Sequence, residues 1–305
     1  MKNQQEYNDL LQPELLNSVE GLVLMSKMII GSYLLGQNQS IKTGQGQVFR
    51  QYRSYQPGDD LRLLDWKMYA RSGRYFVKES EIETNITVKF VIDASASMLH
   101  EDQPKGSKVS IKKIDFARLL AATLAHLALE QGDAIGLFAI NENQLVQLAP
   151  RQHRQHLHRF VYELLQIKPG GKFPAVNDSP LLYHNQGGNK EMIVFISDMY
   201  QHSHEIYKTL EQLSALRNEV LFFHLMGNNE LELNYKGTVT LEDLETGQRV
   251  QVDSQKVRKQ YKEQLAQHLN KIKTQMLDLE ISYDLFSMGE PLDRALNDFL
   301  VKRRF

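Results

Sequence analysis

The stretch FVIDASASMLH, residues 90–100, decides the fold class that we expect for this chain. An apolar run ends in Asp93, and serines follow at every second position, Ser95 and Ser97. In open sheets of parallel strands, ligands bind beyond the carboxyl ends of the strands, at the point where the strand order reverses. Three oxygen-bearing side chains at the end of a buried strand therefore indicate a site at that edge of a sheet.

The rest of the chain repeats a unit of one strand followed by one helix. The predicted strands are residues 86–93, 134–140, 191–198, 219–227 and 281–288, and the predicted helices are residues 112–133, 151–167, 204–218, 254–278 and 291–305. Continuous apolar strands separated by helices indicate a mainly parallel sheet with helices on both faces. We therefore expect an α/β fold with a doubly wound sheet.

A small β-rich subdomain is predicted before this sheet. Apolar residues at helical spacing predict a helix from residue 13 to about residue 35, which Gly36 ends. Two strands and a short helix between them follow, at residues 48–55, 75–85 and 61–73. A hairpin near residues 237–252 is expected to belong to the same second layer. The predicted divisions are residues 1–84 for the helix and β-rich segment, 85–230 for the core, and 231–305 for the hairpin and the closing helix, strand and helix.

Composition excludes several classes of site. The 305 residues carry 36 basic and 37 acidic side chains, a net charge of -1, so no overall field attracts nucleic acid or an anionic membrane. The absence of cysteine excludes disulfides, thiolate metal sites and cysteine nucleophiles. The most apolar stretch, residues 21–36, contains Lys27 and is shorter than the roughly 20 residues that cross a bilayer. With no secretory signal at the N-terminus, we expect a cytoplasmic protein without stable membrane insertion.

A second strand end matches the first. The run EMIVFISDMY, residues 191–200, places Asp198 at the tip of its strand. With Asp93, Ser95 and Ser97, it offers hard oxygen ligands of the kind that suit Mg²⁺, which keeps several waters and needs few protein carboxylates. The alternative is structural, because Asp and Ser also cap helices and satisfy loop amides at such junctions. Two matching junctions in one sheet favour the metal site.

These strand ends carry a resemblance to a known family. The segments DASASM and FISDM, with the order of strands and helices, resemble the von Willebrand factor A fold and its metal-ion-dependent adhesion site. Residues 48–98 more narrowly resemble the bacterial family known as domain of unknown function fifty-eight, and weaker similarity covers roughly residues 30–230. The matching run before the strand consists of Arg53, Tyr55, Pro57, Gly58, Asp59, Asp60, Arg62, Asp65, Trp66, Ala70 and Arg71.

The resemblance implies a non-catalytic protein-binding module, of a kind often paired with MoxR-type AAA+ ATPases. In the adhesion site a metal is held by an Asp, two Ser, a Thr and a further Asp, and an acidic side chain of the partner completes its shell. Four of these five ligands correspond to Asp93, Ser95, Ser97 and Asp198. We therefore expect a protein partner, an AAA+ ATPase, while the sequence assigns no oligomeric state.

The fifth ligand has no counterpart. The loop KPGGKFPAVNDSP, residues 168–180, places Lys172 or Phe173 where the threonine belongs. Either Mg²⁺ binds weakly through the remaining oxygens, or the ammonium of Lys172 takes the electrostatic role of the metal, which would then be absent. The side chains expected to contact a partner around this site are Lys172, Phe173, Met98 and Met199.

Three further candidates have weaker support. The segment around Trp66 is either a docking surface, since Trp and Arg dominate interface hot spots, or a structural clamp with Trp66 buried, which we favour. The histidines of residues 151–160 suit a solvated basic face, whereas His202 and His204 follow a strand tip and could line the cleft. A Mg²⁺-dependent phosphatase-like hydrolase using Asp93 as nucleophile is the alternative function. Phosphatases of this type need a second carboxylate two residues after the nucleophile, and this chain has Ser95 there, so we do not expect an enzyme.

Overall fold

The computed structural model describes residues 13–40, 52–55, 66–78, 86–104, 109–175, 191–216, 218–235 and 237–302. The chain forms two compact units, one of residues 1–33 with 86–305 and one of residues 34–85. Most of the core described below belongs to the first unit. No helix in the described part of the chain is both long and apolar enough to cross a membrane.

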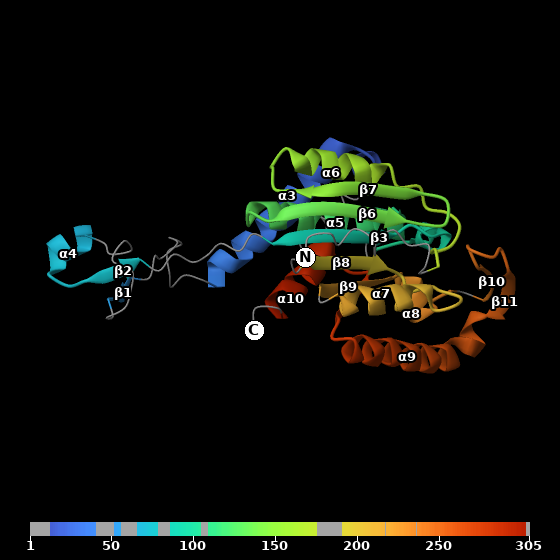
Figure 1. Ribbon diagram of the computed structural model, residues 1–305. Coiled ribbons are helices and arrows are strands. Elements are labelled where there is room, and N and C mark those ends of the chain that lie inside the picture. Colours follow the sequence, from blue (N-terminus) through green and yellow to red (C-terminus); the bar gives the residue numbers. More distant parts are fainter. Residues whose placement is uncertain are drawn as a thin grey trace. The chain divides into compact units, whose positions relative to one another are not determined.

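A six-stranded sheet organises the first unit (Figure 1). Its spatial order is β12-β9-β8-β3-β6-β7. The strands are, in chain order, β3 (Thr87–Asp93), β6 (Ala134–Ile140), β7 (Leu145–Arg151), β8 (Met192–Ser197), β9 (Glu219–Met226) and β12 (Ser282–Ser287). All neighbours pair in parallel except β6 and β7. The predicted fold class, a mainly parallel α/β sheet, is confirmed.

Strand β7 was not predicted. It pairs antiparallel with β6 at the edge of the sheet, and it alternates exposed and more buried residues. An edge strand that faces water on one side lacks the continuous apolar run that marked the parallel strands. Pro150 fits there because an edge position needs no ladder hydrogen bond on its outer side.

The strand order reverses between β3 and β8. Counting the six strands along the chain, β3 is the first, and the second and third lie on one side of it while the fourth, fifth and sixth lie on the other. Crossover connections on the two sides therefore leave the sheet in opposite directions, which opens a crevice beyond the carboxyl ends of the two central strands. Asp93 ends β3, and Asp198 directly follows β8. Both therefore lie at this switch point.

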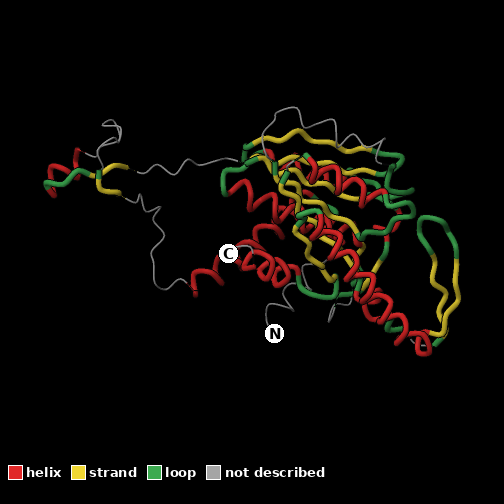
Figure 2. Tube along the Cα trace, turned by 60° about the horizontal axis from the view of Figure 1, so that its bottom comes forward, coloured by secondary structure: helices red, strands yellow, loops and turns green. Residues whose placement is uncertain are grey.

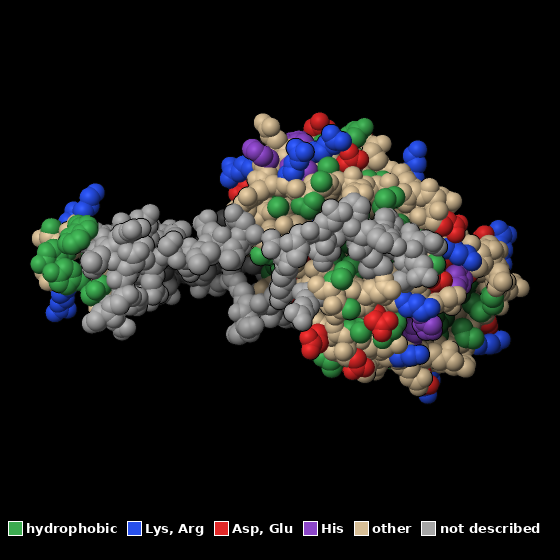
Figure 3. Space-filling view, viewed as in Figure 1, with side chains coloured by type: hydrophobic (Ala, Val, Ile, Leu, Met, Phe, Trp, Pro, Cys, Tyr) green, Lys and Arg blue, Asp and Glu red, His purple; other side chains and the backbone are tan. Residues whose placement is uncertain are grey.

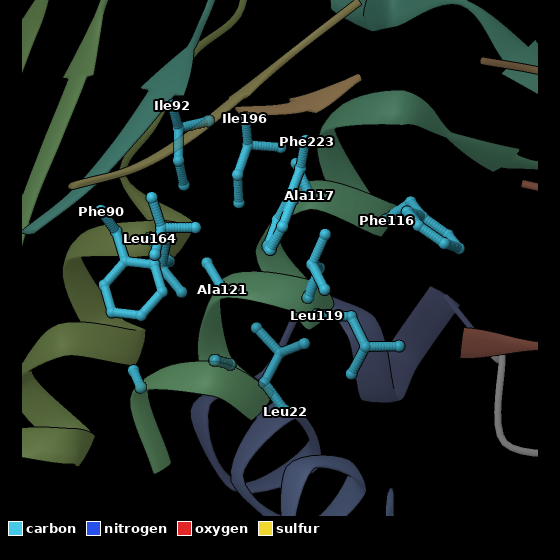
Figure 4. Close-up of a cluster of buried hydrophobic side chains, with 14 of the residues drawn as sticks. Leu22, Phe90, Ile92, Phe116, Ala117, Leu119, Ala121, Leu164, Ile196 and Phe223 are labelled. Atoms are coloured by element: carbon cyan, nitrogen blue, oxygen red, sulfur yellow. The ribbon is translucent and has the colours of Figure 1, made fainter. Parts of the chain in front are cut away.

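Helices cover both faces of the sheet (Figure 1). One face packs against α5 (Lys113–Glu130), α6 (His156–Leu165) and α10 (Leu292–Lys302), with α3 (Val19–Ser40) on the outer side of α5 (Figure 4), and the other face packs against α7 (Glu205–Ala215) and α9 (Ser254–Asp278). Consecutive strand residues divide between the two cores, as Phe90 and Val91 do. Because both faces of the sheet are buried under helices, the sequence of each central parallel strand is a continuous apolar run.

The larger core lies between the sheet and helices α5 and α6, and it extends to α3 on the outer side of α5 (Figure 4). Figure 4 shows Leu22 of α3 beneath the small side chains of α5, with Phe90 and Leu164 beside them. The alanines Ala117 and Ala121 are fully buried, which lets the helix approach the sheet closely. Each fully buried large side chain contributes about 1.5–3 kcal/mol of stability. The packing of α5 against the sheet therefore determines the position of its first residue, Lys113, relative to the strand tips.

The N-terminal helix differs from its prediction in two respects. Helix α3 continues to Ser40, so Gly36 does not end it. Its residues up to Tyr33 belong to the sheet unit, where Leu22 and Met25 are buried in the core, rather than to a division that ends at residue 84. The short helix α2 (Pro13–Leu16) precedes it. A single glycine costs about 1 kcal/mol in a helix and does not have to end it.

Besides the last residues of α3, the described part of the second unit contains one strand pair and one short helix. Strand β1 (Tyr52–Ser54) pairs antiparallel with β2 (Phe76–Lys78), and α4 (Trp66–Ser72) lies between them in the chain. Tyr69 stacks on Tyr75 with ring centroids 4.5 Å apart. Trp66 is 61% exposed and α4 buries none of its residues, so this unit alone does not provide the expected burial of Trp66. Docking of this unit onto the sheet unit stays a prediction.

Most of the predicted Arg and Asp run cannot be placed. Asp60, Arg62 and Asp65 lie outside the described residues, and of Arg53 only the backbone, in β1, is described. Arg71 is exposed near the end of α4. The clamp formed by Arg and carboxylate pairs therefore stays a prediction.

The hairpin belongs to the sheet unit. Strands β10 (Thr238–Glu242) and β11 (Arg249–Asp253) pair antiparallel and lead directly into α9. Its predicted membership of the N-terminal subdomain is wrong, because the hairpin lies at the switch-point end of the sheet (Figure 1, lower right; Figure 2, right). The short helix α8 (Asn228–Glu232) lies between β9 and the hairpin. This placement puts the turn of the hairpin near Asp198.

Candidate functional site

Asp93 is fully buried at the tip of β3. Its Oδ1 accepts a hydrogen bond from the Ser95 amide at 2.8 Å, and its Oδ2 accepts one from the Ser197 hydroxyl at 2.7 Å. The first contact is a local turn in which an aspartate side chain holds the backbone two residues on. Both carboxylate oxygens are therefore engaged in ordering the strand tips.

The two serines connect the strand tips. Ser95 Oγ lies 2.9 Å from Ser97 Oγ, and Ser97 Oγ donates to Asp198 Oδ1 at 3.0 Å. The structure thus brings together all four predicted oxygen ligands, Asp93, Ser95, Ser97 and Asp198, and all four side chains are buried. These contacts form an unbroken series of hydrogen bonds from the end of β3 to the end of β8, so the four residues form one cluster.

The loop expected to supply the fifth ligand lies beside this cluster. The Ala96 amide donates to Gly171 O at 2.9 Å, and the Gly170 amide donates to Ala94 O at 2.9 Å. Gly171 has φ of 62°, a left-handed conformation that favours glycine over residues with a Cβ. The loop is therefore held tightly against the Asp-x-Ser-x-Ser segment.

Side chains on and near this loop point in different directions from those expected. Lys172 is exposed, whereas Phe173 is buried in the second core, where its ring centroid is 6.0 Å from that of Phe195. Met98 is fully buried in the first core. Phe173 and Met98 thus expose little surface in this structure and their contact with a partner stays a prediction, while Met199, although buried, lines the groove described below.

Lys113, which the sequence did not predict as a site residue, is the ammonium beside Asp198. Its Nζ lies 2.8 Å from Asp198 Oδ2 and 2.7 Å from Glu230 Oε1, and its side chain is 3% exposed. Burial opposes its charge, but the two carboxylates raise its pKa above the ordinary value of lysine. The expected role of Lys172 as the positive charge against Asp198 is thus filled by Lys113. The sequence did contain one indication of this role. Lys113 lies in the first turn of a predicted helix, where the helix dipole disfavours a cation, so a nearby carboxylate was to be expected.

The two aspartates have opposite electrostatic environments. Burial alone would raise the pKa of Asp198, but the ammonium of Lys113 lowers it below its ordinary value. Burial, followed by repulsion from Asp198, raises the pKa of Asp93 to about 7. The cluster therefore holds Asp198 as a carboxylate and leaves the charge of Asp93 without a matching cation.

His224 of β9 supports the cluster from below. Its Nε2 lies 3.0 Å from the backbone oxygen of Asp198, and its Nδ1 lies 3.0 Å from Tyr283 Oη. The side chain is 2% exposed, and burial lowers its pKa to about 4. A neutral histidine with both nitrogens engaged positions the Asp198 backbone rather than exchanging protons.

The turn of the β10–β11 hairpin closes over the cluster. Tyr200 Oη donates to Asp243 Oδ2 at 2.7 Å, and His202 Nε2 lies 3.1 Å from Glu245 Oε2. The Glu245 side chain is 1% exposed and lies against the Ser95 hydroxyl. Burial, followed by repulsion from Asp198, raises its pKa to about 7. Nothing in the hairpin sequence indicated that Glu245 would reach a strand tip 150 residues earlier in the chain.

A groove of about 490 Å³ runs between the hairpin and the strand tips. On its hairpin side the lining residues are three apolar ones, Leu241, Leu244 and Val250, and three polar ones, Glu242, Asp243 and Gln248. The lining residues include Ser97, His100, Lys113, Asp198, Met199, Tyr200, His224, Leu241, Leu244 and Val250. We call it the switch-point groove. Leu244 and Val250 are exposed, 45% and 60%.

Residues 51–271 match the family described as "Protein of unknown function DUF58". The chain belongs to this family. Uncharacterized proteins of Mycobacterium tuberculosis and Mycobacterium bovis are 28% identical to it over 244 residues, which is 78% of this chain and 74% of theirs. The family match at residues 51–271 includes the strand tips, the loop at residues 168–173 and the hairpin turn, so the oxygen cluster and the groove lie inside the DUF58 region.

Solved structures that are similar to this DUF58 protein share little sequence with it. The hypothetical protein BatB from Bacteroides thetaiotaomicron has a TM-score of 0.43 and 13% identity, over 72% of this chain and 98% of that one. The SpRpn10 VWA domain has a TM-score of 0.40 and 9% identity, over 70% and 95%. An aerotolerance-related membrane protein from Bacteroides fragilis has a TM-score of 0.39 and 14% identity, over 72% and 100%.

The donor set of the DUF58 site suits a hydrated divalent cation rather than a fully protein-bound one. Among the described residues, no three His, Asp or Glu side chains converge closely enough to hold a metal by themselves. A cation would depend on the hydroxyls of Ser95 and Ser97, on Asp198, and on water, which is how Mg²⁺ is commonly held. Glu245 Oε1 is buried beside these ligands with no hydrogen-bond partner among the described residues.

The histidines expected on a solvated basic face divide into two groups. His153 and His158 are exposed, but His156 is buried and its Nε2 lies 3.1 Å from the backbone oxygen of Ile135. Figure 3 shows basic, acidic and histidine side chains mixed over the surface above α6. His202 reaches the site through Glu245, whereas His204 is exposed before α7. The mixture of charges gives no continuous basic surface on the face shown.

Proposed function

We propose that this DUF58 protein is a non-catalytic protein-binding module whose contact surface is the switch-point groove. The observation that carries the proposal is the combination of two features in one groove. The strand tips supply a buried cluster of oxygen atoms, and the hairpin supplies exposed apolar side chains, Leu244 and Val250, at its rim. Interfaces of proteins commonly join an apolar contact area with a few directional polar groups.

An acidic side chain of the partner, bound through Mg²⁺, is the proposed polar contact. The site contains the carboxyl groups of Asp93, Asp198 and Glu245, whose negative charge would repel an incoming carboxylate. Lys113 is already shared by Asp198 and Glu230, so it offers little to a further anion. A divalent cation at Ser95, Ser97 and Asp198 would reverse the local charge, and the incomplete ligand set makes weak binding the expectation.

The proposed partner is a MoxR-type AAA+ ATPase, with the DUF58 protein acting as its adaptor or co-chaperone in the cytoplasm. The basis is the resemblance of residues 48–98 and the family membership of the chain. A groove with exposed apolar side chains beside it, Leu244 and Val250, suits a protein segment better than a small metabolite.

Use of Asp93 as a phosphoryl-accepting nucleophile has poor support. Its side chain is 0% exposed, and both oxygens accept hydrogen bonds from Ser95 and Ser197. A nucleophile needs an open approach to the reacting atom at about 3 Å. The hydrolase therefore ranks behind the binding module.

Capture of the partner tests this proposal. The full chain is immobilised as wild type, Leu244→Asp and Leu277→Asp, and each is exposed to native lysate in Mg²⁺ or EDTA. Leu277 is 74% exposed on α9, so it is a matched surface control. We expect a MoxR-type ATPase, identified by mass spectrometry, on wild type and Leu277→Asp in Mg²⁺, and about tenfold less on Leu244→Asp or in EDTA. Absence of an AAA+ protein from every sample would refute the proposal that a MoxR-type ATPase is the partner.

A further inference from the structure

The turn of the hairpin holds Glu245 in a fixed direction. Asp243 Oδ1 accepts from the Glu245 amide at 2.9 Å, and Asp243 Oδ2 accepts from Thr246 Oγ1 at 2.6 Å. The Gly247 amide closes the turn on Asp243 O at 2.7 Å, with Gly247 at φ of 71°. Side chains on either side of Glu245, at positions 244 and 246, are exposed, whereas that of Glu245 is 1% exposed. The turn therefore presents one carboxyl group inward.

This carboxyl group occupies the place that an acidic ligand would take. It lies against the hydroxyl of Ser95, a residue of the oxygen cluster, on a turn that Tyr200 joins to the strand tip through Asp243. His202 engages one of its oxygens at 3.1 Å, and the other, Oε1, is buried without a hydrogen-bond partner among the described residues. A buried carboxylate oxygen without a hydrogen-bond partner destabilises the folded protein, so the contacts around Glu245 are incomplete in the closed hairpin.

We propose that Glu245 is an intramolecular ligand of the strand-tip cluster, and that a partner presenting a glutamate on a similar tight turn binds there only after the hairpin is displaced. This inference rests on the proposed function, because it names the regulation and the partner chemistry of the same site. The two carboxylates cannot share one position next to Ser95 and Asp198, so binding in trans and the closed hairpin exclude each other.

The hairpin is built so that displacement costs little. Nearly all residues of β10 and β11 are exposed or half-buried, and the pair forms its own two-stranded sheet, separate from the six-stranded one. Few buried apolar contacts make a segment prone to local opening. At its base, Ser254 Oγ donates to Tyr235 O at 2.7 Å and to Gly237 O at 3.1 Å. The base is thus anchored, while the turn is held by Tyr200 through Asp243 and by His202 and Ser95 through Glu245.

Hydrogen exchange of the full-length protein tests whether Glu245 holds the hairpin. The variants are Glu245→Ala and, as a matched control, Glu242→Ala, which removes an exposed ion pair with Arg249 in the same hairpin. We expect the amides of residues 238–253 to exchange about tenfold or more faster in Glu245→Ala, with little change in Glu242→Ala. Equal exchange in Glu245→Ala and wild type would overturn the proposal.

A peptide with the sequence of the turn tests whether the position of the Glu245 carboxyl group beside Ser95 is a binding site. The probe is a labelled peptide of residues 241–249, LEDLETGQR, together with the same peptide in which the glutamate matching Glu245 is alanine. The proposal predicts binding to Glu245→Ala at least about tenfold tighter than to wild type, and loss of binding for the alanine peptide. Equal binding to both proteins, or no measurable binding to Glu245→Ala, would contradict it.

Failure of this inference is distinguishable from failure of the proposed function. Neither the exchange nor the peptide experiment contains the ATPase, so both outcomes are independent of the partner's identity. In the capture experiment, Glu245→Ala should retain more ATPase than wild type. If the ATPase is absent from both while the peptide still prefers Glu245→Ala, the internal ligand stands and the AAA+ partner is refuted.

Discussion

Lys113 and Asp198 form a buried ion pair at the switch point, with Nζ 2.8 Å from Oδ2 and side chains 3% and 2% exposed. Lys113 comes from the first turn of α5 and Asp198 from the end of β8, so the pair connects a helix start to a strand tip. Such pairs contribute little net stability when compared with apolar packing, but removing one partner leaves an uncompensated buried charge. Most of the site's electrostatic character follows from this pair.

The adjacent lysines Lys112 and Lys113 give the first prediction. Lys113→Met should lower the free energy of unfolding by about 3–5 kcal/mol, because Asp198 and Glu230 lose their cation. Lys112→Met should change it by less than about 1 kcal/mol, since Lys112 forms an exposed pair with Glu101 at 3.7 Å. Urea unfolding of both variants measures the difference. Effects of equal size would show that Lys113 is not buried in its ion pair.

Asp93 predicts an unusual dependence of stability on pH. Its folded pKa of about 7 lies above its unfolded value of 3.8, so the folded state binds more protons between these values. The stabilisation is fully present below the unfolded pKa and is lost as pH rises through 7. In EDTA, Asp93→Asn should therefore gain roughly 2–3 kcal/mol relative to wild type between pH 5 and pH 8.

The control for this prediction is Mg²⁺. A bound cation favours the ionised carboxylate, so adding Mg²⁺ should stabilise wild type at pH 8 and reduce the advantage of Asp93→Asn. Parallel stability profiles of the two proteins in EDTA would mean that Asp93 is ionised throughout, and the account of its burial would be wrong.

Asn141 should support the site from outside it. Its Nδ2 donates to Ala94 O at 2.8 Å and Lys168 O at 3.0 Å, joining the strand tip to the neighbouring loop. Asn141→Ala should cost about 2–4 kcal/mol because several buried backbone groups lose their partners. The exposed neighbour Asn143, changed to Ala, is the control. Thermal unfolding that fails to separate the two variants would refute this bracing role.

The register of α9 gives a prediction about packing. Met276 is fully buried in the second core, whereas the next residue, Leu277, is 74% exposed. Met276→Ala should cost about 2–5 kcal/mol, and Leu277→Ala should be nearly neutral, within about 0.5 kcal/mol. Chemical denaturation measures both. The reverse order would mean that α9 presents a different face to the sheet.

The fold was largely predictable because its parallel strands are buried on both faces. Strands β3, β6, β8 and β9 each carry a continuous apolar run, and α9 begins at Ser254 as predicted because Asp253 caps it through the Lys256 amide. Strand β7 was missed because an exposed edge strand lacks such a run. Gly36 was misjudged because a single glycine does not have to end a long helix.

The site was predictable only where its residues follow directly from strand ends. Asp93, Ser95, Ser97 and Asp198 are fixed by local sequence, since each lies within a few residues of a strand tip. Glu245 and Lys113 reach the same point from elements that are distant in the chain, and residue type alone does not show which distant elements meet. The loop containing Lys172 was placed correctly beside the site, but the direction of its side chain depends on how Phe173 packs into the core.

Calorimetric titration of Mg²⁺ into the full chain tests most directly whether the strand-tip cluster is a cation-assisted binding site. We predict saturable binding of about one ion with a dissociation constant near the millimolar range. Ser97→Ala should abolish it, while Ser214→Ala should leave it unchanged, because Ser214 Oγ donates to Leu279 O away from the site. No saturable binding by wild type, or equal binding by Ser97→Ala, would contradict the account.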